Sequence, residues 1–244
     1  MLVFVHGVPE TAALWDRLRA QLDEASVALS LPGFGCPRPS GFGATKDDYV
    51  SWLLGELDRI DEPIDLVGHD WGAGLTYRVA TAYGDRVRSW SADVANLLLP
   101  EYVWHDFARI WQTPGDGEKF FEDQAAAPIE ARTSVFESLG VPHDDAVTMS
   151  MAGDATMASC ILDIYRSALP NVYADWGQAF APTAAPGLVL CPSDDPFGDE
   201  VQSSRFAELL GARHETMPGL GHWWPVQGPE TAASVLQAFH RSVR

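Results

Sequence analysis

The chain has 244 residues, of which 46% are hydrophobic, so it can form one core domain with an insertion and is too apolar to be disordered. Its formal net charge of −18 disfavours nucleic acid and anionic membrane as partners, because both repel acidic surfaces. The three cysteines are odd in number and widely spaced, which indicates a reducing, cytoplasmic compartment rather than a disulfide framework or metal site. The first residues do not resemble a secretory leader, and no segment is long enough to span a membrane.

The first part of the sequence alternates short apolar runs with amphipathic stretches. We expect strands at 2–5, 27–31, 64–67 and 87–92, and helices at 10–22, 45–60 and 71–83. Thr45 is suited to cap the second helix, because Asp47 and Asp48 then lie in its first turn, where the helix dipole favours anions. The alternation predicts an α/β fold with a mostly parallel, doubly wound sheet.

The alternation stops after Asn96 and resumes near residue 187. Residues 97–180 are rich in aromatic side chains and mainly helical in pattern, with breaks at prolines. Further on we expect strands at 187–191 and 213–217, and helices at 199–210 and 229–240. The predicted organisation is a core, 1–96 and 181–244, interrupted by a helical cap, 97–180. Such insertions lie at the carboxyl ends of the strands, where ligands bind.

A glycine-rich turn, Gly68-His69-Asp70-Trp71-Gly72, joins the third predicted strand to its helix. Gly-x-Asp-x-Gly in this place has the pattern of a nucleophile elbow, with Asp70 at its exposed centre. Gly68 and Gly72 would allow the tight crossing, and Gly74 would allow close helix packing. The alternative is an ordinary strand–helix turn with Asp70 as an N-cap, and the pentapeptide alone does not decide between them.

Two other segments place partners for this turn in the chain order nucleophile, acid, histidine. His222 lies in the loop before the last helix, where the catalytic histidine of such a fold falls. Asp195 follows the strand at 187–191 and can orient that imidazole, with Asp194 as the fallback. A third segment, His6-Gly7-Val8, follows the first strand, and we assign its Val8 N–H and the Trp71 N–H to an oxyanion hole.

These segments resemble the epoxide hydrolase and haloalkane dehalogenase branch of the α/β-hydrolases, whose nucleophile is an aspartate. The similarity rests on residues 6–10 (HGVPE), 31–35 (LPGFG), 68–72 (GHDWG) and 221–223 (GHW), and it extends more loosely to 111–115 and 164–167 in the cap. The resemblance implies that Tyr165, in the last of these segments, donates a proton to an epoxide oxygen.

Three departures from the family pattern are visible. The chain opens on the strand that carries His6, so the leading hairpin is absent and we expect about six strands. Phe107 stands in the place of the first cap tyrosine, and Tyr102, Tyr173 or His105 are the candidates to replace it. Many dehalogenases have asparagine as a halide ligand where this chain has Val8.

The resemblance implies a hydrolase that forms an alkyl ester on Asp70, which His222 and Asp195 then hydrolyse. Epoxide hydrolysis to a vicinal diol is the preferred activity, in a pocket that includes Trp104, Phe107 and Trp111. The alternatives are a haloalkane dehalogenase, with halide held by Trp71 and by Trp104, Trp111 or Trp176, and an inactive hydrolase fold that binds a small molecule. We expect no cofactor, no metal and a small-molecule substrate; the oligomeric state is left open, with a homodimer as one option.

Overall fold

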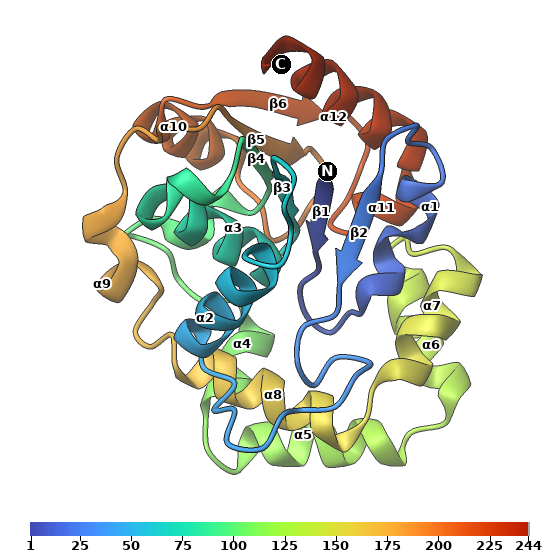
Figure 1. Cartoon of the computed structure of the whole chain (residues 1–244). Coiled ribbons are helices and arrows are strands. Elements are labelled where there is room, and N and C mark those ends of the chain that lie inside the picture. Colours follow the sequence, from blue (N-terminus) through green and yellow to red (C-terminus); the bar gives the residue numbers. More distant parts are fainter. Residues whose placement is uncertain (244) are drawn as a thin grey trace.

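The computed structural model describes residues 1–243 and contains one sheet of six strands, all parallel, in the order β2-β1-β3-β4-β5-β6 (Figure 1). The strands are β1 (Leu2–Val5), β2 (Ser26–Leu29), β3 (Asp65–Gly68), β4 (Ser89–Ala92), β5 (Gly187–Pro192) and β6 (Arg213–Met217). The order reverses beside β1, so the carboxyl ends of β1 and β3 flank the place where a doubly wound sheet binds ligands. The predicted α/β fold and the count of six strands are confirmed.

The helices of the sheet region cover both faces. They are η1 (Ala12–Trp15), α1 (Asp16–Arg19), α2 (Lys46–Leu57), α3 (Trp71–Ala82), η2 (Gly84–Arg86), α10 (Glu200–Leu210), α11 (Trp224–Gln227) and α12 (Pro229–Val243). Thr45 caps α2 as expected, in a reciprocal capping box with Asp48. One apolar core packs α2, α3 and α10 on one face, and a second packs η1, α1 and α12 on the other.

The segment between β4 and β5 is helical and lies below the carboxyl ends of the strands in Figure 1. Its elements are η3 (Ala95–Leu98), α4 (Asp106–Gln112), α5 (Asp116–Ala126), α6 (Ile129–Ser138), α7 (His143–Ala152), α8 (Ala155–Arg166), α9 (Tyr173–Trp176) and η4 (Gly177–Ala179). The helical content predicted for 97–180 is confirmed, whereas the division into separate domains stays a prediction. Within residues 1–243 no helix combines the length and apolar character needed to cross a bilayer.

The predicted helix over 10–22 is wrong. The Thr11 side chain accepts a hydrogen bond from the Ala13 N–H, and the chain turns as the short 3₁₀ helix η1 before the four residues of α1. Leu14 and Leu18 are nevertheless both buried against the sheet. The leucine spacing therefore indicated burial correctly, but not a continuous helix.

Candidate active site

Asp70 lies at the crossing between β3 and α3, with the backbone angles φ 52° and ψ −120°. These angles are strained for a residue with a Cβ. The crossing needs its two glycines, because a Cβ on Gly68 would lie 2.3 Å from the Gly72 carbonyl oxygen, and one on Gly72 2.2 Å from that of Val5. Gly74 is not needed in the same way, since its Cβ would meet Leu97 at an ordinary 3.6 Å. Asp70 makes no side-chain capping bond to α3, which removes the N-cap alternative.

The loop after β1 holds one oxygen of the Asp70 carboxylate. The Val8 N–H donates to Oδ1 at 2.8 Å, and Gly7 packs so closely that a Cβ there would lie 2.2 Å from the same atom. Of the two predicted oxyanion donors, Val8 is the one bonded to Asp70 among the described residues; Trp71 is the first residue of α3, where its N–H has no acceptor within the helix. Burial raises the pKa of Asp70 to about 6, because desolvation penalises the charged carboxylate.

His6 in the same loop has a structural role. Its Nδ1 is 2.8 Å from the Gly7 carbonyl, and its Nε2 accepts from the Leu31 N–H at 3.1 Å. Full burial lowers its pKa to about 4, so the ring is neutral.

His222 and Asp195 meet as the sequence predicted. The Nδ1 atom of His222 is 2.9 Å from Asp195 Oδ2, and its Nε2 faces Asp70 Oδ2 at 3.9 Å. The other oxygen of Asp195 accepts from the Phe197 N–H at 2.8 Å, which fixes the carboxylate. Burial opposes the charged form of His222, but the charge of Asp195 and the hydrogen bond to it outweigh this and raise the pKa. The fallback Asp194 is exposed and bonds to the Ser193 hydroxyl instead.

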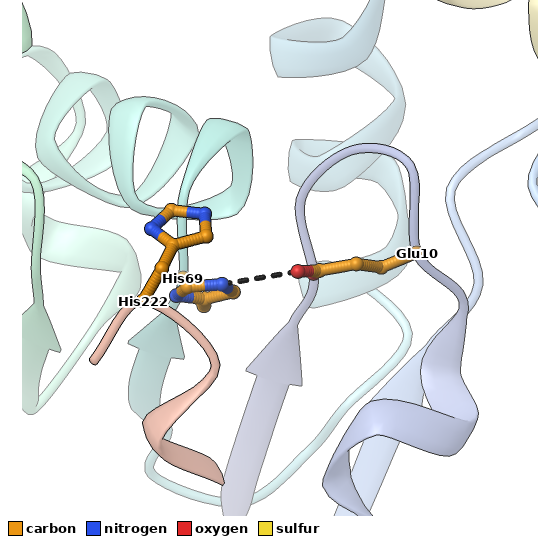
Figure 2. Close-up of side chains that lie close together, drawn as sticks. All are labelled: Glu10, His69 and His222. Carbon is orange, nitrogen blue, oxygen red and sulfur yellow. Dashed lines mark hydrogen bonds and ion pairs between the residues drawn. The ribbon is translucent and has the colours of Figure 1, made fainter. Parts of the chain in front are cut away.

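A second buried imidazole, His69, packs against His222, with the ring centroids 4.6 Å apart (Figure 2). Its Nε2 is 3.1 Å from Glu10 Oε1 and its Nδ1 is 2.6 Å from Asp93 Oδ2. Burial opposes protonation, but the two carboxylates raise the pKa of His69 well above its ordinary value, so the ring is an imidazolium. The positive charge of His69 opposes the rise in the pKa of His222, which keeps that histidine closer to the range of a general base.

Asp93 connects His69 to the backbone of Asp70 and to Trp224 at the start of α11. One oxygen accepts from the Asp70 N–H at 3.0 Å, and the other accepts from the Trp224 indole N–H at 2.6 Å as well as from His69. Sequence reasoning missed Asp93, although an acid directly after β4 was a signal. It also missed Glu10, whose second oxygen accepts from the Gly7 N–H at 2.9 Å.

Glu10, His69 and His222 also have the composition of a metal site, since their ligand atoms lie within 4.8 Å of one another (Figure 2). Both nitrogens of His69 are, however, already hydrogen-bonded to carboxylates. The Nδ1 of His222 is likewise bonded to Asp195. The group is therefore a network of hydrogen bonds, with no lone pair of His69 left for a cation.

A cavity of about 630 Å³ lies between Asp70 and the helical segment, a size usual for small-molecule sites. Its walls are mainly apolar, and Asp70, His222, Trp71 and Val8 lie at the strand ends. The predicted pocket residues all line it: Trp104, Trp111 and the half-exposed Phe107. Asp195 lies behind His222 and is not part of the lining.

Two tyrosines share this cavity with Asp70. Tyr165 is buried on α8, with its ring 5.3 Å from that of Trp71, and Tyr102 lies in the loop before α4. Burial raises both phenol pKa values, and the nearby Asp70 charge raises them further. Of the three candidates for a second tyrosine-like donor, Tyr102 and His105 line the cavity, while Tyr173 lies on α9 outside it.

Comparison with known proteins shows the family of the chain. The model of the alpha/beta hydrolase family matches residues 2–235. Epoxide hydrolase 3 of Xenopus tropicalis is 25% identical over 98% of this chain and 71% of its own length. A haloalkane dehalogenase of Mesorhizobium japonicum is 24% identical over 70% of this chain and 53% of its own length.

Solved structures show the same fold. The haloalkane dehalogenase DbeA from Bradyrhizobium elkani superimposes with a TM-score of 0.74 at 19% identity, covering 99% of this chain and 91% of that one. The chain therefore belongs to the alpha/beta hydrolase family, as an epoxide hydrolase-like enzyme that is similar also to haloalkane dehalogenases.

Proposed function

We propose that the chain hydrolyses an epoxide of an apolar small molecule to a vicinal diol through a covalent ester on Asp70. The observation that carries this proposal is the pairing of two phenols, Tyr102 and Tyr165, with the Asp70 carboxylate in one apolar cavity. Opening an epoxide needs a nucleophile on carbon and a proton for the ring oxygen, and these three groups supply both.

In the first step, Oδ2 of Asp70 attacks an epoxide carbon and the carbon–oxygen bond of the ring breaks. Oδ1 stays on the Val8 N–H, so Oδ2 is the oxygen directed at the substrate. Tyr165, helped by Tyr102, gives its proton to the ring oxygen, which leaves a hydroxyl on the substrate and a tyrosinate in the cavity. Asp70 needs no base for this step, because it is ionised above a pKa of about 6.

In the second step, His222 takes a proton from water, and the hydroxide attacks Cγ of the Asp70 ester. The 3.9 Å between His222 Nε2 and Asp70 Oδ2 exceeds a hydrogen bond, so a water can lie against both groups. The N–H groups of Val8 and Trp71 stabilise the oxyanion. Collapse breaks the bond between Cγ and the substrate oxygen, and the proton of the added hydroxyl passes to that oxygen, so the diol leaves and Asp70 is again a carboxylate. The proton on His222 restores the tyrosine.

The test uses a panel of epoxides and haloalkanes, with diol and free halide as the measured products. Diol from the epoxides is the expected result, and single turnover in heavy-oxygen water should label the Asp70 carboxylate. Turnover with an unlabelled Asp70 would overturn the covalent mechanism. Absence of both products would favour the inactive, ligand-binding fold.

A second candidate function, dehalogenation, is favoured by one observation. Halide needs N–H donors, and the indole N–H of Trp111 is buried beside the cavity with no partner among residues 1–243. The other two cap tryptophans are engaged, since Trp104 donates to the Pro170 carbonyl and Trp176 to Asp47. Free halide that disappears on Trp111→Phe, with diol formation retained, would show that both chemistries occur here.

A further inference from the structure

The cavity has a second polar region, formed by residues of α6 and α7, apart from the strand ends that carry Asp70. Arg132 of α6 and Ser150 of α7 both line it. The Arg132 Nε and the Ser150 hydroxyl are buried, and neither has a hydrogen-bond partner within residues 1–243. Buried donors in native proteins are nearly always paired, so two unpaired ones at the same cavity wall indicate a group that arrives with the ligand.

These two side chains lie on α6 and α7, two helices that pack against each other. A Cβ placed on Gly153 would lie 4.0 Å from Arg132 Nη1 and 3.8 Å from the backbone carbonyl oxygen of Ser150, so the Arg132 guanidinium lies close to the end of α7 that carries Ser150. Among the described residues that line the cavity, Arg132 is the one with a basic side chain. It forms no ion pair with another residue in the range 1–243.

The acids that line the cavity form no ion pair with Arg132 in the described part of the chain. Glu118 is paired with Arg166 at 2.8 Å, and Asp154 accepts from the Met157 N–H as the cap of α8. Glu122 is exposed to solvent. Within residues 1–243 Arg132 therefore has no counter-ion, so an anionic group of a ligand can supply one.

We propose that Arg132 and Ser150 form a carboxylate subsite, and that the substrate is an apolar chain with its reactive group at Asp70 and a carboxylate at Arg132. The planar guanidinium fork fits a carboxylate through two N–H groups, and the serine hydroxyl adds a third donor. The apolar wall between the two polar regions, formed by residues such as Phe136, Met157 and Ile161, suits an aliphatic chain. This inference rests on the proposed function for the reactive end only.

Binding of unreactive ligands tests the subsite independently of turnover. Dodecanoic acid, its methyl ester and dodecanol would be titrated into the protein by calorimetry at pH 8, with dodecyl phosphate as a further anion. We expect the acid to bind about tenfold or more tightly than the ester, because a hydrogen bond to a charged group contributes about 1.5 kcal/mol or more. Equal affinity for acid and ester would overturn the proposal, and tighter binding of the phosphate would replace carboxylate by phosphate as the ligand.

Variants separate a subsite from a general effect of charge or packing. Arg132→Gln should remove the preference for the acid and leave ester binding unchanged, and Ser150→Ala should weaken acid binding less. Arg59→Gln is the matched control, since Arg59 is exposed at the end of α2 and changes the net charge equally. Equal weakening of acid and ester by Arg132→Gln would contradict the subsite.

Turnover of an ω-epoxy fatty acid and its methyl ester completes the test. Arg132→Gln should raise KM for the acid with kcat unchanged, which is the signature of lost ground-state binding. Acid-selective binding without diol formation would leave the subsite standing and reject the proposed function. Diol formation without any preference for the acid would support the proposed function and reject the carboxylate subsite.

Discussion

The strand ends and the cap side of the cavity differ in how their buried polar groups are satisfied. At the strand ends, Glu10, His69, Asp93, Asp195 and His222 are hydrogen-bonded to one another or to backbone groups. On the cap side, the indole N–H of Trp111, the Nε of Arg132 and the hydroxyl of Ser150 are buried without partners in the described part of the chain.

The difference separates two kinds of polar residue. A satisfied network is rigid and fixes the position of a reacting carboxylate and imidazole to within the tolerance that catalysis needs. Unsatisfied groups around an apolar space gain their partners from what binds there. The contrast therefore assigns chemistry to the strand ends and substrate recognition to the cap side.

The largest expected effect is the loss of turnover when His222 is replaced. His222→Gln should lower kcat on the order of 10⁴-fold, because the ester on Asp70 then has no base to activate water. Intact-mass measurement after mixing with an epoxide should show one alkyl group per chain. His143→Gln is the control, since His143 is exposed and bonded to Glu137. Turnover at the normal rate without ester accumulation would remove His222 from the mechanism.

The next largest effect is a loss of stability, which tests whether the hydrogen-bond network around His69 depends on the charge of that imidazole. Asp93→Asn removes a partner of the buried His69 imidazolium and should cost about 3 kcal/mol of unfolding free energy, measured by urea denaturation. The pKa of His69 is raised in the folded state. Its protonation therefore stabilises the fold fully below the unfolded-state pKa of about 6.5, and this stabilisation is lost as the pH rises through the folded-state pKa.

The difference in stability between wild type and Asp93→Asn should therefore narrow as the pH rises above about 6.5. Asp194→Asn, in an exposed loop, should leave stability unchanged. Equal stability of Asp93→Asn and wild type at pH 6 would show that His69 is neutral.

Tyr165→Phe should lower kcat/KM for an epoxide about 10²-fold, the usual scale for losing a general acid. Turnover of a haloalkane needs no proton for its leaving group and should be unaffected. Tyr173→Phe is the control, because Tyr173 lies outside the cavity. A Tyr165→Phe enzyme with full activity on epoxides would transfer the proton donation to Tyr102.

The smallest effect concerns pH. The pKa of Asp70 is raised to about 6 by burial, so the carboxylate becomes protonated as the pH falls through that value. We expect kcat/KM to fall about tenfold by pH 5, with Asp70 and His222 titrating as a coupled pair. Circular dichroism at each pH controls for unfolding. An acid limb near pH 4, the usual range of aspartate, would mean that Asp70 is solvated in the free enzyme.

The sequence predicted the elements whose signals are local. All six strands begin and end within two residues of their expected bounds, and Thr45, Gly68 and Gly72 act as their residue types suggest. The order of Asp70, Asp195 and His222 along the chain predicted the group that the structure brings together. The helix over 10–22 was predicted wrongly, because a leucine period reports burial and not hydrogen bonding.

The residues that the sequence did not predict depend on contacts between distant segments. Asp93 is a single acid after a strand, and its importance comes from Trp224, 131 positions later, and from His69. Arg132 lies in an ordinary polar helix, and only the absence of a partner in the folded cavity distinguishes it from other surface arginines. No spacing in one sequence reports an unpaired atom.

The position of the helical segment in the sheet has a consequence for divergence between relatives. The chain leaves the sheet after β4 and returns on β5, and these strands are hydrogen-bonded neighbours, with Trp90 paired to Gly187. Because the two strands are parallel, the segment leaves at the carboxyl end of β4 and re-enters at the amino end of β5, so it forms the crossover between them, and its length or sequence can change without altering the strand register. Exchange of this segment between relatives should carry the choice of substrate with it while the strand-end network remains unchanged.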